Sequence, residues 1–164
     1  MRTAQGTPVQ KLAIGGVVAA LYTALTLVFA PISFSQIQLR VSEALTLLPV
    51  LSGASVPGLF IGCLISNLIT GQPWQDVVFG SLATLIAALL TRKFRKKIGL
   101  AALMPVLVNA LVIGLMLYYV YGLPPFISIL TVGAGELAVC FLLGIPLVGI
   151  LRQRGIGLQQ DPPV

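Results

Sequence analysis

Long apolar runs alternate with short polar segments along almost the whole chain. The runs cover residues 11–31, 41–70, 75–91, 99–122 and 125–151. A helix needs about 20 apolar residues to cross the hydrocarbon core of a bilayer, and most of the runs have that length. The pattern therefore predicts an all-α integral membrane protein.

The second run is longer than one spanning helix requires. It contains Pro49, the small-residue segment S-G-A-S at 52–55, and Pro57. Proline interrupts a helix and small polar residues favour turns, so the run is either one kinked helix or two short helices joined by a turn.

The basic residues favour two helices over one. Lys and Arg occur at Arg2 and Lys11, in R-K-F-R-K-K at 92–97, and at Arg152 and Arg154. Cytoplasmic loops are enriched in Lys and Arg. With two helices in the second run, nine of the ten basic residues lie on one side and only Arg40 lies on the other.

We therefore expect one membrane domain over residues 1–164, a bundle of six transmembrane helices with both termini cytoplasmic. The expected helices are about 11–31, 41–52, 54–70, 75–91, 99–122 and 125–151, and residues 152–164 form a polar cytoplasmic tail.

Composition narrows the class of protein further. Of the 164 residues, 57% are hydrophobic and 9% are charged, and no polar stretch is long enough for a soluble catalytic domain. The net charge of +6 comes from residues that flank apolar runs. Anionic membrane lipids, rather than nucleic acids, are the expected neighbours of this charge.

Few acidic residues occur, and two of them have simple structural explanations. Asp161 lies in the polar tail, and Asp76 can cap the fourth helix. Glu43 lies in the first turn of the second helix, where the helix dipole favours a carboxylate. Arg40, three residues earlier, can pair with it on the same face.

Glu136 is harder to explain, because it lies about eleven residues into the last helix and so near the bilayer midplane. A charge at that depth costs about 2.5–3.5 kcal/mol on insertion scales. A proton-carrying role, a ligand contact and a structural hydrogen bond are the three interpretations.

Polar and aromatic residues gather at the expected outer ends of the helices. Asn67 can reach a pocket there, whereas Asn109, in the middle of the fifth helix, is expected to bond to another helix. The aromatic residues form an interfacial belt or the roof of a pocket. They are Trp74, Tyr118, Tyr119 and Tyr121.

Small residues recur every four positions in the first helix, which lets another helix approach closely. One row is Gly16, Ala20 and Ala24, and the adjacent row is Gly15, Ala19 and Thr23. A doubled row suits docking against a second protein as well as packing inside the bundle.

Several chemistries have no support in the sequence. There is no histidine and no G-x-x-x-x-G-K-[ST] nucleotide loop, and Cys63 and Cys140 each lie within an apolar run. We expect two buried thiols, no metal site and no cofactor. The chain is not expected to be an enzyme or to hydrolyse ATP itself.

Two segments resemble a known family. R-V-S-E-A-L-T-L-L-P at 40–49 and D-V-V-F-G-S-L-A-T-L at 76–85 are similar to the queuosine precursor transporter family, the substrate-binding (S) components of energy-coupling-factor (ECF) transporters. The resemblance extends from the first helix to about residue 150. It implies a six-helix protein of a prokaryotic plasma membrane that captures a deazaguanine outside the cell.

The resemblance also implies partners. An S component associates with a transmembrane scaffold subunit and two ATPase subunits, and related S components contact the scaffold through an A-x-x-x-A-type motif on the first helix. The matching positions here are Gly16, Ala20 and Ala24, with glycine at the first.

A deazaguanine presents a ring N–H and an exocyclic amine, which one carboxylate can accept together. Glu43 or Glu136 is expected to do so, an amide or Arg40 to bind the carbonyl, an aromatic ring to stack on the base, and Asp76 to suit an aminomethyl substituent. The candidate substrate-binding residues are Arg40, Glu43, Asn67, Trp74, Asp76 and Glu136.

Other functions remain open from the sequence. The chain can be an S component for another vitamin-like nutrient, a small proton-coupled carrier that uses Glu136, or an assembly subunit that binds no small molecule.

Overall fold

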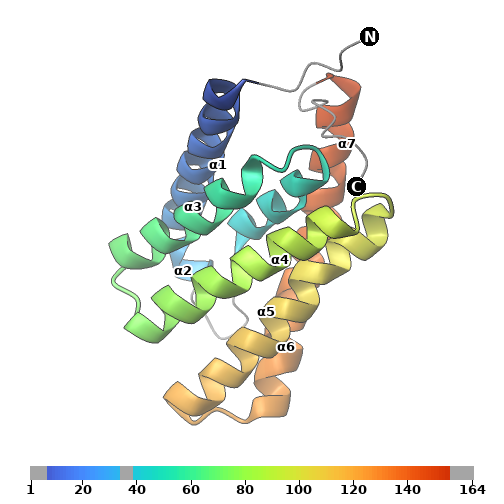
Figure 1. Ribbon diagram of the computed structural model, residues 1–164. Helices are drawn as coiled ribbons and strands as arrows, with labels where there is room; N and C mark the ends of the chain where they lie inside the picture. The colour runs from blue at the N-terminus through green and yellow to red at the C-terminus, as the bar shows by residue number, and fades with distance from the viewer. Residues whose placement is uncertain (1–6, 34–38, 156–164) are drawn as a thin grey trace.

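The computed structural model describes residues 7–33 and 39–155, with the backbone alone at 32 and 33 (Figure 1). Arg2, residues 34–38 of the first outer segment, and the tail from 156 onward with Asp161 lie outside the described residues. All regular structure in the described part is helical, which confirms the all-α class. In chain order the elements are α1 (Pro8–Val28), α2 (Ala30–Ser33), η1 (Val41–Val50), α3 (Ser55–Ile69), η2 (Asp76–Gly80), α4 (Ser81–Lys93), α5 (Ile98–Tyr121), α6 (Pro125–Val139), η3 (Cys140–Gly144) and α7 (Ile145–Gln153).

Three helical segments in the described part are long and apolar enough to cross a membrane. They are α1, α5 and the continuous segment Pro125–Gln153, which comprises α6, η3 and α7. The helices η1 and α3 are apolar but shorter. The chain is thus a helical membrane protein, while six crossings and cytoplasmic termini stay predictions.

Most of the helices form a ring in which neighbours in sequence pack together. The contacts run from α1 to α3, from α3 to α4, from α4 to α5 and from α5 to α6 (Figure 1). The first helix of this series, α1, and α7, which continues from α6, stand apart at the end of the molecule where α1 begins and α7 ends. The ring is therefore open on one side.

The segment η1 occupies the middle of this ring. It packs against α1, α3, α4, α5, α6, η3 and α7. Every residue from Ser42 to Leu47 is buried. The polar side chains of Ser42, Glu43 and Thr46 are thus enclosed by the rest of the bundle instead of facing lipid.

The geometry of η1 differs from the expected α-helix over 41–52. It is a 3₁₀ helix of ten residues, with i to i+3 hydrogen bonds at both ends, such as Glu43 N–H to Arg40 O at 2.9 Å. Pro49 lies inside it and has no N–H to donate, which weakens an α-helical ladder. A ten-residue 3₁₀ helix is about 20 Å long, which is shorter than the hydrocarbon core. The turn after it leads to α3, so the second apolar run does form two helices.

Close packing of α1 on α3 depends on glycine. A Cβ atom built on Gly58 would lie 2.4 Å from the Gly15 carbonyl oxygen, and one on Gly62 would lie 2.9 Å from the Ala19 carbonyl oxygen. The Thr23 hydroxyl donates to the Gly62 carbonyl at 3.2 Å. The row Gly15, Ala19 and Thr23, which we call the inner row of α1, therefore packs on α3 inside the bundle.

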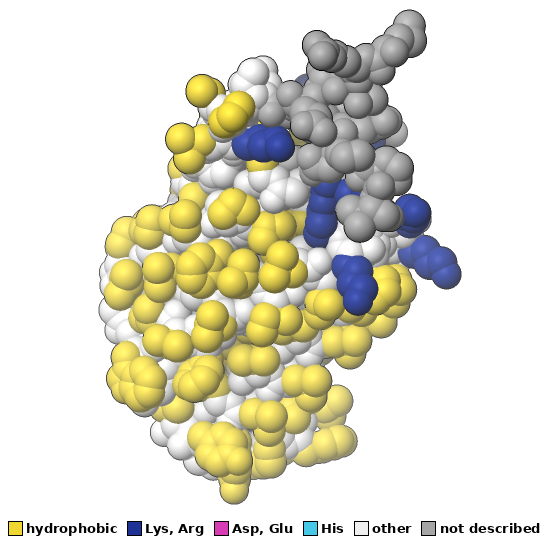
Figure 2. Space-filling view, in the orientation of Figure 1, with side chains coloured by type: hydrophobic (Ala, Val, Ile, Leu, Met, Phe, Trp, Pro, Cys, Tyr) yellow, Lys and Arg dark blue, Asp and Glu magenta, His cyan; other side chains and the backbone are white. Residues whose placement is uncertain are grey.

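The surface separates into a basic end and an apolar body (Figure 2). The basic residues near the ends of helices gather toward the end of the molecule where α1 begins and α7 ends, and large apolar side chains cover much of the remaining visible face. The connections from α3 to α4 and from α5 to α6 lie at the opposite end (Figure 1). Gly122 ends α5 with a φ of 67°, a left-handed conformation that favours glycine in this turn.

Replacing Gly58 with alanine should destabilise the bundle. The new methyl group meets the Gly15 backbone, which cannot rotate away, and such overpacking costs about 1–3 kcal/mol. Thermal unfolding in detergent measures the loss. Gly16→Ala is the matched control, because its methyl group meets nothing within 4 Å; equal melting temperatures for the two variants would contradict the predicted α1–α3 contact.

Candidate ligand-binding site

Polar side chains from most of the helices meet at the centre of the bundle. We call this group the buried polar cluster; all its members are at most 4% exposed. It consists of Tyr22, Arg40, Glu43, Asn67, Asp76, Thr84, Asn109 and Glu136. A polar group in an apolar interior is costly unless it is bonded, so the bonds of each member matter.

Glu43 is the most enclosed carboxylate. It is fully buried near the start of η1, and the Tyr22 hydroxyl of α1 donates a hydrogen bond to its Oε1 atom. Thr84 and Asn109 are further polar neighbours. Its Oε2 atom has no hydrogen-bond partner within the described residues. One buried acceptor of Glu43 is therefore left without a donor by the described part of the chain.

Glu136, in contrast, has contacts at both carboxylate oxygens. The Asn109 side-chain amide donates to Oε1 at 2.9 Å, and the Cys140 thiol lies 3.8 Å from Oε2. The bond between Asn109 of α5 and Glu136 of α6 confirms that Asn109 links two helices. This bond also supports a structural role for Glu136.

Arg40 supplies the positive charge of the cluster. It lies at the N-terminus of η1 and is 4% exposed. It interacts electrostatically with all three carboxylates of the described residues, which are Glu43, Asp76 and Glu136. This interaction lowers the cost of burying negative charge, because opposite charges attract strongly in a medium of low dielectric constant.

Asn67 and Asp76 extend the cluster toward the end opposite the basic residues. The Asn67 amide donates to the Asp76 backbone carbonyl at 3.1 Å, and Asn67 Oδ1 has no partner within the described chain. The Asp76 carboxylate accepts a long bond of 3.5 Å from the Tyr121 hydroxyl. Asp76 is therefore bonded to α5, which a capping role alone does not explain.

Two short π-helical segments border the cluster and η1. In η2, a Cβ on Gly80 would lie 3.2 Å from the Asn67 amide nitrogen and 3.8 Å from Arg40 Nη1. In η3, a Cβ on Gly144 would lie 3.2 Å from the Ala44 carbonyl. The π turn of η2 thus brings a glycine against the polar cluster, and that of η3 brings one against η1; such turns are frequent at functional sites.

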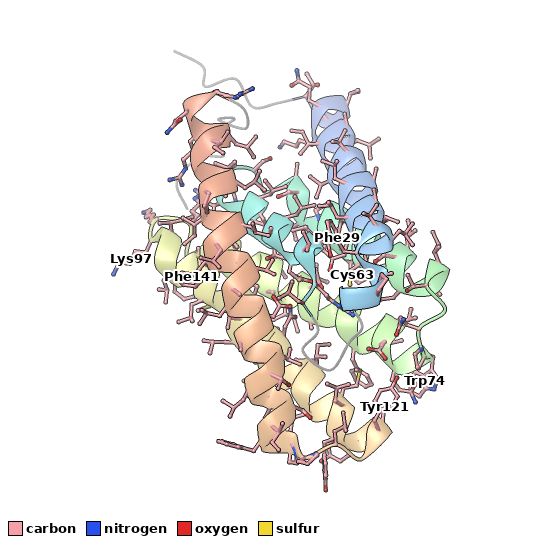
Figure 3. All side chains as sticks on the ribbon, turned by 180° about the vertical axis from the view of Figure 1, so that it is seen from behind. Phe29, Cys63, Trp74, Lys97, Tyr121 and Phe141 are labelled. Carbon is pink, nitrogen blue, oxygen red and sulfur yellow. The ribbon has the colours of Figure 1, made fainter. Side chains whose placement is uncertain are left out.

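Trp74, Tyr118 and Tyr119 lie at the surface, outside the buried polar cluster, whereas the Tyr121 hydroxyl bonds to Asp76. Trp74 is 66% exposed and, with Tyr121, lies at the end of the molecule far from Lys97 (Figure 3). Tyr118 and Tyr119 are also exposed and contact each other edge to face. An interfacial belt fits this exposure, and stacking of Trp74 on a ligand stays a prediction.

The other small-residue row of α1, which we call the outer row, faces away from the bundle. Gly16, Ala20 and Ala24 are all exposed. The two rows of α1 therefore have different surroundings, because the inner one packs on α3 and the outer one is open to a neighbour.

Sequence reasoning did not include Tyr22 or Thr84 in the site. A signal for Tyr22 was present, because a tyrosine far from either end of an apolar helix needs a partner for its hydroxyl group. Its partner, Glu43, is 21 residues away, and spacing alone does not reveal that contact. Cys63 and Cys140 are buried free thiols, as expected.

Together, the helical fold, the apolar surface and the enclosed polar cluster define a membrane-embedded protein with a polar site inside its bundle. Comparison with known proteins identifies its family. The QueT transporter family matches residues 12–153, and the chain belongs to that family. The expected family is therefore confirmed.

One curated relative supports this assignment over part of the chain. It is the "Queuosine precursor transporter QueT" of Lactococcus lactis subsp. cremoris (strain MG1363), which is 40% identical over 72 residues. The alignment covers 43% of this chain and 42% of that protein, less than half of either. No solved structure matches the chain.

The bond between Asn109 and Glu136 predicts a measurable coupling. Asn109→Leu leaves a buried carboxylate without its amide donor and should cost about 1–3 kcal/mol of stability. Adding Glu136→Leu removes the stranded group, so the double variant should lose less stability than the sum of the two single variants. Thermal or denaturant unfolding in detergent gives the three values, and simple additivity would show that the bond contributes little.

Proposed function

We propose that the chain is the substrate-binding S component of an ECF importer and that it binds a deazaguanine precursor of queuosine at the buried polar cluster. Membership of the QueT transporter family and the name of the relative support this class of substrate. The observation that carries the site is a pair of buried acceptors, Glu43 Oε2 and Asn67 Oδ1, without partners in the described residues.

The chemistry of the base matches these acceptors. A deazaguanine has a ring N–H beside an exocyclic amine, and both need acceptors when the base leaves water. In our proposal Glu43 accepts from this edge, because both oxygens of Glu136 already have contacts. Tyr22 holds Glu43 in place from the other side.

The remaining candidate residues have supporting roles in this proposal. Arg40 orients Glu43 or binds the carbonyl of the base, since it interacts with every carboxylate of the cluster. Asp76 suits the cation of an aminomethyl substituent, because it lies at the side of the cluster nearest Tyr121. Trp74 covers the ligand from the outer end. Glu136, held by Asn109, forms the floor of the site.

The topology of an importer fits the distribution of charge. In the proposed orientation the basic end faces the cytoplasm of a prokaryotic cell, as the enrichment of Lys and Arg in cytoplasmic loops predicts. Asn67 and Asp76 then lie toward the outside. The exposed row of Gly16, Ala20 and Ala24 contacts the scaffold subunit, which two ATPase subunits drive.

Ligand binding in detergent tests the proposed site. We expect calorimetry to show tight binding of the amino, cyano or free-base form of the precursor, and none of riboflavin or biotin. Glu43→Gln retains an acceptor for Tyr22 but loses the charged acceptor, so affinity should fall by about 1.5–3 kcal/mol, or roughly tenfold to 150-fold. Glu136→Gln retains a carbonyl for Asn109 and should change affinity by less than about fivefold.

If Glu136→Gln lowered the ligand affinity more than Glu43→Gln, the ligand contact would lie at Glu136 instead. A folded protein that binds riboflavin or another nutrient but no deazaguanine would favour an S component for that nutrient. A folded protein that binds none of these molecules would favour the assembly role.

Transport tests the proposed partners. Ala20→Leu places a bulky side chain on the exposed row and should reduce ATP-driven uptake in liposomes with scaffold and ATPase subunits on the order of tenfold, because small residues permit close helix contact. Ligand affinity should not change. Ala134→Leu, on an exposed position of α6, is the matched control. Accumulation by the chain alone under a proton gradient would instead support a proton-coupled carrier.

A further inference from the structure

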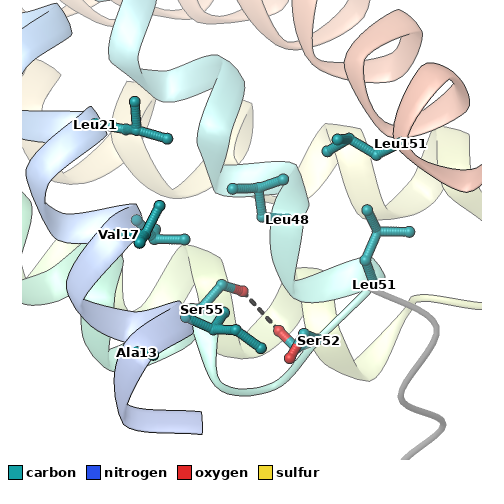
Figure 4. Close-up of a pocket in the computed structure, with 10 residues that line it drawn as sticks. Ala13, Val17, Leu21, Leu48, Leu51, Ser52, Ser55 and Leu151 are labelled. Carbon is teal, nitrogen blue, oxygen red and sulfur yellow. Dashed lines mark hydrogen bonds between the residues drawn. The ribbon is translucent and has the colours of Figure 1, made fainter. Parts of the chain in front are cut away.

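A groove of about 350 Å³ lies on the open side of the ring, between α1 and α7 (Figure 4). Val17 and Leu21 of α1 form one wall, Leu151 of α7 forms the other, and Leu48 and Leu51 lie between them. The groove is separate from the buried polar cluster, with which it shares no residue.

The lining of the groove is almost entirely apolar. The two serines at its edge have hydrogen bonds of their own, since Ser55 Oγ donates to the Ser52 carbonyl at 2.6 Å and Ser52 Oγ accepts from the Ala54 N–H at 3.3 Å. Val17 is 59% exposed and Leu21 is 48% exposed, so the groove opens to the surroundings. A hydrocarbon chain, and not a polar metabolite, suits such a surface.

Two cations lie just beyond the groove at the basic end. Lys11 precedes Ile14, a groove residue, by three positions, and Arg154 follows Leu151 by three. Lys11 lies on α1, on the same face as Ile14, and Arg154 is the residue that caps the C-terminus of α7, so each cation lies about one turn past the groove. Both are exposed. The carboxylates in the described part of the chain all belong to the buried polar cluster and do not reach these cations.

We propose that this groove is a binding site for one anionic phospholipid, with an acyl chain between α1 and α7 and the headgroup phosphate between Lys11 and Arg154. An apolar groove that ends at a pair of cations is complementary to a molecule with a hydrocarbon chain and an anionic head. A free phosphate ion supplies only the head, so it leaves the groove unfilled. The proposal does not depend on which ligand the buried polar cluster binds.

Fluorescence quenching by brominated lipids tests the proposal in nanodiscs with the full-length chain. Trp74→Phe removes the native tryptophan emission, and Val17→Trp places a single reporter in the groove. At equal lipid content, brominated phosphatidylglycerol should quench this reporter at on the order of tenfold lower mole fraction than brominated phosphatidylcholine, because the groove holds the acyl chain of one lipid beside two cations that bind its headgroup.

Two controls separate a built site from general attraction to basic residues. Leu89→Trp reports from an exposed position on α4, one turn from Arg92 and Lys93 but outside the groove, and should show no more than about a twofold preference. Adding Lys11→Gln and Arg154→Gln to Val17→Trp should abolish the preference for phosphatidylglycerol. Adding Lys96→Gln and Lys97→Gln should leave it unchanged.

Other outcomes overturn the proposal. Equal quenching of the groove reporter by the two lipids would indicate an unselective lipid-facing surface. Absence of quenching by either lipid would indicate that a protein segment or a second copy fills the groove, and oligomeric state in the same nanodiscs would identify a second copy. Circular dichroism and melting of each variant exclude misfolding as the cause.

Discussion

The burial of Glu43 is the constraint on which the rest of this structure depends. Its carboxylate lies in a segment that the other helices of the bundle surround, where water cannot solvate it. An isolated charge in such a place is unfavourable by several kcal/mol. The Tyr22 hydroxyl bonds to one oxygen and the charge of Arg40 lies nearby. The hydrogen bond of this one side chain thereby fixes the position of η1 relative to α1.

This constraint gives a physical reason for the irregular helices around the centre. A 3₁₀ segment is longer per residue than an α-helix, so η1 reaches from the polar cluster to the turn before α3 with only ten residues. The π turns at η2 and η3 place Gly80 and Gly144 against neighbouring groups without a Cβ atom between them.

The segment η1 also connects the buried polar cluster with the groove between α1 and α7. Glu43 belongs to the buried polar cluster, and Leu48 and Leu51 belong to the groove between α1 and α7. Because η1 packs against every long helix, a displacement at either end of η1 alters its packing against the rest of the bundle. The buried polar cluster and the groove beside α1 are therefore linked through one segment of the chain.

The sequence by itself determined the class of the protein, the approximate extent of its helices and its family. The length of an apolar run and the positions of proline and glycine are local properties of the sequence, so they predict helix bounds well. The fifth helix, for example, expected at 99–122, runs from Ile98 to Tyr121. The motifs at 40–49 and 76–85 likewise carry the family without any knowledge of contacts. Only the tertiary structure decided that Tyr22 bonds to Glu43, that Glu136 is held by Asn109, and which small-residue row of α1 packs on α3. These outcomes depend on pairs of residues that are distant in the sequence: Tyr22 and Glu43 are 21 positions apart, and Asn109 and Glu136 are 27 apart. Helical periodicity fixes which residues share a face of one helix, but the direction of that face is set by what the other helices bring against it.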